Sequence, residues 1–157
     1  MFDNRIIILE GPDGSGKTTL ARQLHHLRGH AIVKAGPPAP GEDMLASYMG
    51  SLDAAIARST PTVFDRHWLG EGIYGPLLRG VDRLGDAGRA AVEARITEAH
   101  AEVVICAPPW DVVVAGWRSK DDLVKDEALL RKVYDRYVEE AARLGLTPYD
   151  WTRHKEV

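Results

Sequence analysis

One stretch near the start of the chain, residues 11–18, constrains the fold more than any other. It reads GPDGSGKT and fits the pattern G-x-x-x-x-G-K-[ST] at every fixed position. The glycines allow a tight turn whose N–H groups converge, and a helix beginning near Gly16 adds the positive end of its dipole. Residues 6–9, which read IIIL, precede this turn as a strand buried on both faces would. Lys17 can then reach the β- and γ-phosphates of a nucleotide, and the Thr18 hydroxyl can bind Mg²⁺.

A glycine-rich turn that binds nothing is the alternative, and it explains fewer of these residues. Such a turn needs no Lys-Thr pair after its last glycine, no buried strand before it and no amphipathic helix after it, yet all three are present. We therefore predict a phosphate-binding loop (P-loop). Asp13 fits either a turn-stabilising role or an approach to the phosphates. The residues expected to contact the donor nucleotide are Gly11, Asp13, Gly14, Ser15, Gly16, Lys17, Thr18 and Thr19.

The bulk composition predicts a protein of the cell interior. The chain has 157 residues, a length that suits one domain, residues 1–157, with a single core. Its net charge of −3 gives no general attraction to nucleic acid or to an anionic membrane. The single cysteine, Cys106, excludes an intrachain disulfide and favours a reducing, cytoplasmic compartment. We expect neither a signal peptide nor a membrane span.

Apolar periodicity divides the rest of the chain into alternating strands and helices. Strands are predicted at residues 6–9, 30–35, 61–64, 102–106 and 146–151. Helices are predicted at residues 18–28, 42–58, 70–79, 86–101, 110–117 and 121–144. This alternation predicts a three-layer α/β/α domain around a five-stranded parallel sheet. The Gly- and Pro-rich residues 36–41 are either a rigid linker or a wall of a ligand site beyond a strand end.

A second candidate site, Asp65-Arg66, comes directly after the third predicted strand. A carboxylate in this position can bind Mg²⁺ through water or orient the attacking group, and the guanidinium can bind an acceptor phosphate. A surface ion pair is the alternative interpretation. Because parallel strands all end at the same edge of a sheet, we expect Asp65 to lie beside the P-loop.

A third feature, residues 118–122, reads RSKDD and lies between two predicted helices. Phosphoryl transfer requires positive charge over the γ-phosphate in the transition state, and the P-loop supplies only Lys17. Arg118, together with Lys120, is the nearest candidate for the remaining charge. A solvated hinge between the helices is the alternative.

With these features placed, the chain resembles the thymidylate kinase group of nucleoside monophosphate kinases. Residues 10–19, EGPDGSGKTT, match that group's pattern E-G-x-D-G-x-G-K-[ST]-T. Asp65-Arg66 and Tyr74 match the spacing of its D-R-[YFW]-x-x-S-x-x-A-Y pattern, with His67 in place of the aromatic residue. The sequence GEGIYGPLLRG at residues 70–80 is similar to that of compact, phage-encoded members.

The resemblance implies a P-loop kinase fold with ATP at residues 11–18 and Mg²⁺ near Thr18 and Asp65. It further implies that Arg66 binds the acceptor phosphate and that Asp13 and Tyr74 lie near the acceptor nucleoside. In members whose loop lacks arginine the charge comes from a lid, and Arg118 is the matching position in a lid at residues 115–122. The family's Phe-Pro-x-Arg is replaced by GPPA at residues 36–39, so no preference for thymine is implied.

These features predict transfer of the γ-phosphoryl group of ATP to a deoxynucleoside monophosphate. A kinase of a hydroxyl on a nucleoside, a modified base or a polynucleotide is one alternative, although the acidic net charge does not favour nucleic acid. A nucleotide-binding ATPase module is another. Its guanine-specific form is excluded because Asn4 is the only asparagine, so no Asn-Lys-x-Asp motif exists. The expected partner is a small nucleotide, and a homodimer stays open.

Overall fold

The structure, a computed structural model, describes residues 1–36, 38–120 and 124–154. Its strands are β1 (Ile6–Glu10), β2 (Ala31–Lys34), β3 (Thr62–Asp65) and β4 (Glu102–Ile105). Its helices are α1 (Lys17–Arg28), α2 (Met44–Ala57), α3 (Leu69–Tyr74), α4 (Gly85–Glu98), α5 (Trp110–Arg118) and α6 (Glu127–Arg143), and a wide turn, η1 (Gly75–Arg79), continues α3.

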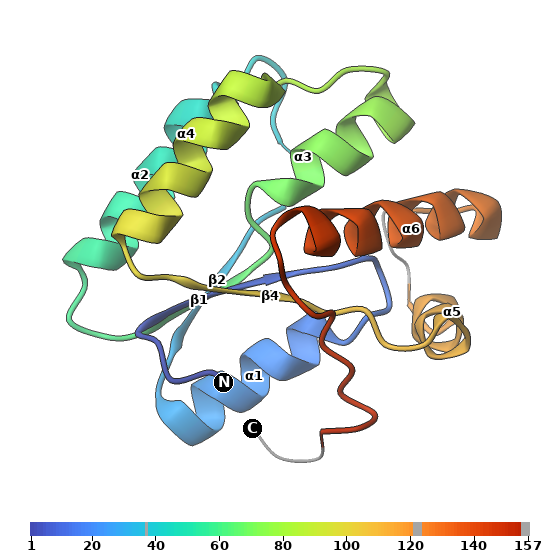
Figure 1. Ribbon diagram of the computed structural model, residues 1–157, viewed down its shortest axis with the longest axis horizontal. Helices are drawn as coiled ribbons and strands as arrows, with labels where there is room; N and C mark the ends of the chain where they lie inside the picture. Colours follow the sequence, from blue (N-terminus) through green and yellow to red (C-terminus); the bar gives the residue numbers. More distant parts are fainter. Residues whose placement is uncertain (37, 121–123, 155–157) are drawn as a thin grey trace.

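The four strands form one parallel sheet in the order β2-β3-β1-β4. Helix α1 covers one face of this sheet, and α2, α3, α4 and α6 lie on the other side (Figure 1). The first four predicted strands are therefore confirmed, as is the layered α/β arrangement. Because β1 lies between β3 and β4, the loop that follows it emerges in the middle of the sheet edge.

The alternation of side chains along β1 divides the core into two parts. Ile6 and Ile8 belong to a cluster with Phe64 on the α2–α6 side, whereas Ile7 and Leu9 pack with residues of α1 on the other side. All these β1 side chains are buried. The run of branched residues before the P-loop is therefore a strand buried on both faces, as predicted.

The prediction of a fifth strand at residues 146–151 is wrong. Among the described residues, this segment adds only an isolated parallel bridge between Tyr149 and Cys106. The Tyr149 amide donates to the Ile105 carbonyl at 2.7 Å, and the Ala107 amide donates to the Tyr149 carbonyl at 3.0 Å. Pro109 has no amide hydrogen to donate to the carbonyl of residue 151, so the bridge does not extend in that direction.

Two helices are clearly shorter than the prediction. The helix predicted at residues 121–144 begins at Glu127, where the side chain of Asp126 caps it by accepting from the Ala128 amide at 2.7 Å. Residues 121–123 lie outside the described part of the chain. The helix predicted at 70–79 is regular only to Tyr74, because Pro76 has no amide hydrogen to donate to the carbonyl of the preceding turn. Within the described residues, no helix is long and apolar enough to cross a membrane.

Candidate active site

The P-loop connects β1 to α1. It packs closely against Cys106, which follows β4, and against α5. Gly11 and Gly14 have positive φ angles of 146° and 80°. A Cβ atom on Gly11 would lie 2.3 Å from the Cys106 carbonyl oxygen, and one on Gly14 would lie 2.4 Å from that of Val113. Both the backbone conformation and the close approach therefore require glycine. The loop is held in a curled form by its neighbours.

Lys17 begins α1 and is buried against the loop that precedes it. Its ammonium donates to the Pro12 carbonyl at 2.7 Å and to the Ser15 hydroxyl at 3.2 Å. Burial lowers the pKa of Lys17 to about 8, while the nearby carboxylates of Asp13 and Asp65 oppose this shift. The ammonium is therefore still mostly protonated at neutral pH and adds positive charge to the amides of the loop.

Thr18 and Asp65, the two predicted metal ligands, are in direct contact. The Thr18 hydroxyl donates to Asp65 Oδ2 at 2.8 Å. The register of the sheet explains the contact, because Asp65 at the end of β3 lies opposite Leu9 of β1. A hydroxyl beside a carboxylate is a donor set that suits Mg²⁺. Among the described residues, no group of three or more His, Cys, Asp or Glu side chains could hold a metal ion.

Asp13 joins the P-loop to the residues predicted to contact the acceptor. Its buried carboxylate accepts from the Arg66 guanidinium and, at 3.2 Å, from the Tyr74 hydroxyl. Its second oxygen accepts from the Val124 amide at 3.0 Å. The Arg66 guanidinium also lies 5.4 Å from the centre of the Tyr74 ring. The three residues proposed for acceptor binding are thus brought together at one point on the loop.

A cavity of about 730 Å³ opens in front of these residues. The P-loop forms one end, and the loop after β2, the first turns of α2 and the turn after β3 form the other. The basic side chains that line it are Lys17, Lys34, Arg66, Arg79, Lys120 and Lys125. A cavity of this size with positive charge on several sides fits a phosphorylated small molecule.

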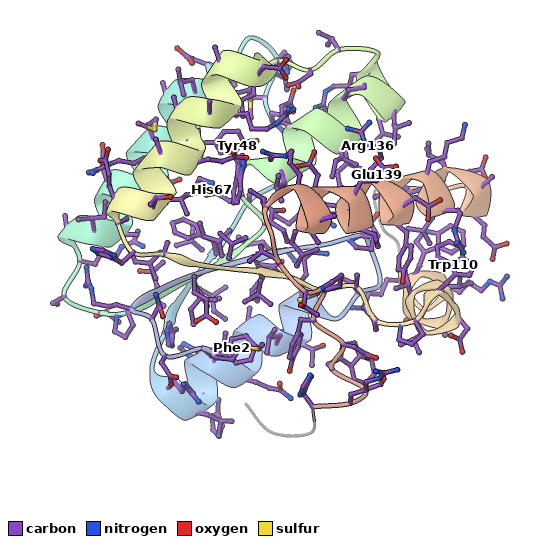
Figure 2. The ribbon with its side chains drawn as sticks, viewed as in Figure 1. Phe2, Tyr48, His67, Trp110, Arg136 and Glu139 are labelled. Atoms are coloured by element: carbon purple, nitrogen blue, oxygen red, sulfur yellow. The ribbon has the colours of Figure 1, made fainter. Side chains whose placement is uncertain are left out.

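His67, which replaces the family's aromatic residue, forms part of the cavity wall beside Tyr48 (Figure 2). The ring centres of the two residues are 5.0 Å apart, and Phe64 lies at the same distance on another side. His67 Nε2 lies 2.8 Å from the Ser51 hydroxyl oxygen. Burial lowers the pKa of His67 to about 4, so the ring is neutral at physiological pH and contributes no charge to the site.

Arg118, the predicted lid cation, is placed differently from the expectation. It ends α5, its side chain is 67% exposed, and it forms an ion pair with Glu127 at 2.7 Å. It is not among the residues that line the cavity, whereas Lys120 is. Of the lid predicted at residues 115–122, positions 115–118 belong to α5, and positions 121–122 lie outside the described residues.

A second hollow, of about 410 Å³, lies on the other side of the P-loop. Its lining includes Gly14, Thr19, Lys120 and Trp151. The Trp151 indole donates to the Ser15 carbonyl at 3.1 Å, and the residue is 44% exposed. The sequence analysis did not identify Trp151 as a site residue. Its position at the end of the last predicted strand, residues 146–151, could have placed it at the P-loop edge, because parallel strands end there.

Comparisons with known proteins support the fold. No protein-family model and no curated protein sequence matches the chain. The structure resembles the YorR protein of Bacillus subtilis, solved with phosphorylated GDP, with a TM-score of 0.69 and 22% identity over 93% of this chain and 84% of that one. It also resembles deoxyadenosine kinase of M. mycoides, solved with dATP, with a TM-score of 0.59 and 15% identity over 92% and 90% of the two chains. The chain therefore has the P-loop kinase fold.

Proposed function

We propose that this protein transfers the γ-phosphoryl group of ATP to the phosphate of a deoxynucleoside monophosphate. The main support is the 2.8 Å contact between Thr18 of the P-loop and Asp65 at the end of β3. This contact puts a loop suited to the donor and an arginine suited to the acceptor, Arg66, in the same cavity. The two phosphates that must react could then meet without a large rearrangement of the chain.

The residues have complementary roles in this reaction. The P-loop amides and Lys17 would bind the donor phosphates, and Arg66 would orient the acceptor phosphate for in-line attack. An oxygen of the acceptor phosphate forms a bond to the γ-phosphorus while the bond to the β-phosphate oxygen breaks, so the products are ADP and a deoxynucleoside diphosphate. Mg²⁺ at Thr18 and Asp65 would offset the charge on the donor phosphates.

A hydroxyl acceptor, as in a nucleoside kinase, is less well supported. Such a reaction benefits from a carboxylate that accepts the hydroxyl proton. Of the buried carboxylates at the cavity, Asp65 would bind Mg²⁺, and Asp13 and Glu71 form ion pairs with Arg66 and Arg79. A monophosphate needs no such base, because its oxygens are anionic at neutral pH. Tyr74 stays protonated as a donor, since burial raises the pKa of its hydroxyl above the usual value.

The direct test is transfer by the purified protein in the presence of ATP and Mg²⁺. Each common deoxynucleoside and ribonucleoside monophosphate is supplied separately, and the nucleotide products are separated by chromatography. A diphosphate formed with equimolar ADP supports the proposal. Phosphate transfer to a nucleoside or an oligonucleotide, with none to any monophosphate, would replace it by the hydroxyl kinase. ADP release without an acceptor product would favour the ATPase module.

Trp151 offers a prediction about the donor base. The base of ATP should stack on the exposed indole in the second hollow, because the P-loop beside it fixes the phosphates. Replacing Trp151 by alanine should weaken ATP binding about tenfold, as calorimetry would measure, in line with about 1–3 kcal/mol for base–aromatic stacking. ATP should also quench tryptophan fluorescence in the wild type.

The matched control for that experiment is Trp110→Phe. Trp110 packs against Tyr134 and Arg131 and lines neither cavity. The quenching should persist in Trp110→Phe and disappear in Trp151→Phe. An ATP affinity unaltered by Trp151→Ala would place the base elsewhere.

A further prediction concerns the lid cation. Lys120 lines both hollows and so lies beside the path of the donor phosphates, whereas Arg118 is paired with Glu127. Lys120→Ala should lower kcat at least about tenfold, and by more than Arg118→Ala does, because charge over the γ-phosphate acts mainly in the transition state. Steady-state kinetics of both variants, with the exposed Lys132→Ala as a control, would decide. If Arg118→Ala lowered kcat more than Lys120→Ala, Arg118 would be the lid cation, as the resemblance implies.

A further inference from the structure

The turn that presents Arg66 requires support from the rest of the fold. Arg66 has a φ angle of 74°, which lies in the left-handed region that non-glycine residues rarely adopt. Such a conformation persists only where neighbouring contacts fix it. This backbone conformation sets the direction of the Arg66 side chain, which is the proposed ligand of the acceptor phosphate. The contacts that fix the turn therefore also fix the acceptor site.

The contacts that fix the turn come from two consecutive residues of β1. The Arg66 amide donates to the Leu9 carbonyl at 2.9 Å. The next amides, of His67 and Leu69, both donate to Oε1 of Glu10, at 3.0 Å and 3.1 Å. Gly11 and the P-loop follow directly. The same short piece of strand therefore anchors both the donor loop and the acceptor turn.

Glu10 is an unusual residue for this position. Its side chain is fully buried at the end of a strand that otherwise reads IIIL. Its second oxygen, Oε2, has no hydrogen-bond partner among the described residues. A buried carboxylate is costly unless its contacts compensate, and a hydrocarbon would satisfy the packing of this strand. The two amide contacts of Oε1 are the side-chain hydrogen bonds that explain its presence.

We propose that Glu10 is a positioning residue, whose Oε1 atom holds the turn after β3 so that Arg66 faces the P-loop. Glu10 does not line the cavity, and it acts through the backbone amides on either side of Trp68. Its role in acceptor binding rests on the proposed function, whereas its hold on the turn does not.

Two substitutions of similar size separate this role from simple packing. Glu10→Gln keeps an oxygen that can accept from both amides, whereas Glu10→Leu fills the volume without one. Hydrogen exchange of the His67 and Leu69 amides, followed by NMR, should remain slow in Glu10→Gln and accelerate at least tenfold in Glu10→Leu. Exchange at the centre of α1 should stay as in the wild type, which excludes global loosening as the cause.

The kinetic arm uses the monophosphate that gives product with the wild type. Glu10→Leu should raise the KM for this acceptor about tenfold and leave the KM for ATP within about twofold, while Glu10→Gln should match the wild type in both. When Arg66 is already replaced by alanine, Glu10→Leu should raise the acceptor KM little further, because both changes remove the same interaction.

Several results would overturn the inference. They are unaltered amide exchange in Glu10→Leu, an acceptor KM equal to that of the wild type, or a Glu10→Gln variant as defective as Glu10→Leu. If the exchange results are as expected but the wild type transfers no phosphate to any monophosphate, the proposed function fails and the hold of Glu10 on the turn stands. If Glu10→Leu does not fold, the Glu10→Gln variant decides alone. An amide cannot replace a carboxylate that is needed for its charge, so a defective Glu10→Gln variant would overturn the inference.

Discussion

Replacing Lys17 by alanine should lower kcat for phosphoryl transfer by about a thousandfold or more. The lysine is the cation of the P-loop, and its ammonium lies within hydrogen-bond distance of two loop oxygens, those of Pro12 and Ser15. When the triphosphate is bound, the ammonium would move from these oxygens to the β- and γ-phosphates, where negative charge develops during transfer. Stabilisation of developing charge by one preorganised donor is worth about 10²–10³ in rate, and a full charge in a buried site exceeds this.

The measurement is single-turnover and steady-state transfer from labelled ATP, with the folded state of the variant checked by thermal unfolding. Lys17→Arg should recover only part of the rate, because a guanidinium keeps the charge but not the compact shape that fits beside the loop. Lys132→Ala, on the exposed surface of α6, is the matched control. A Lys17→Ala variant within tenfold of the wild-type kcat would remove this lysine from the mechanism.

The parts of the fold predicted from sequence are those with a strong local signal. The run of branched residues in β1 and the glycines and lysine of the loop each require one conformation, so residues 6–18 could be placed before the structure was known. The position of Asp65 followed from the rule that parallel strands end at one edge, and the pairing of Leu9 with Asp65 agrees with that expectation. The prediction of a fifth strand was wrong because the apolar residues at 146–151 favour β-structure, whereas among the described residues this segment pairs with the sheet only through Tyr149.

Features that depend on packing between distant segments could not be predicted. Whether a lysine or an arginine lines the cavity depends on where α5 ends, and residues 118–120 carry both types in sequence. In the sequence, Glu10 is only the first residue of a matched motif. Its physical role follows from its contacts with the amides of His67 and Leu69, which only the folded chain brings together. Asp13, for which two roles stayed open, accepts from Arg66, Tyr74 and the Val124 amide, three groups that lie far from it in the chain.

Arg66→Ala should lower kcat/KM for the acceptor about 10²–10³-fold while ATP affinity stays within about threefold of the wild type. A guanidinium binds a phosphate through two parallel hydrogen bonds, and alanine removes both of them together with the charge. Arg66 lies partly buried, with a side-chain exposure of 25%, so water replaces these bonds poorly. The loss should be shared between KM and kcat, because the same contacts orient the acceptor oxygen for attack.

The control arginine is Arg136, which lies on the outer surface of α6 and forms an exposed ion pair with Glu139 at 3.4 Å (Figure 2). Exposed pairs contribute about 0–1 kcal/mol, so Arg136→Ala should retain wild-type kinetics and stability. Arg66→Lys should fall between the wild type and Arg66→Ala, since it restores charge without the fork. Wild-type acceptor kinetics in Arg66→Ala would assign the acceptor phosphate to another cation of the cavity, and Arg79 would then be the next to substitute, because it lines the same space from η1.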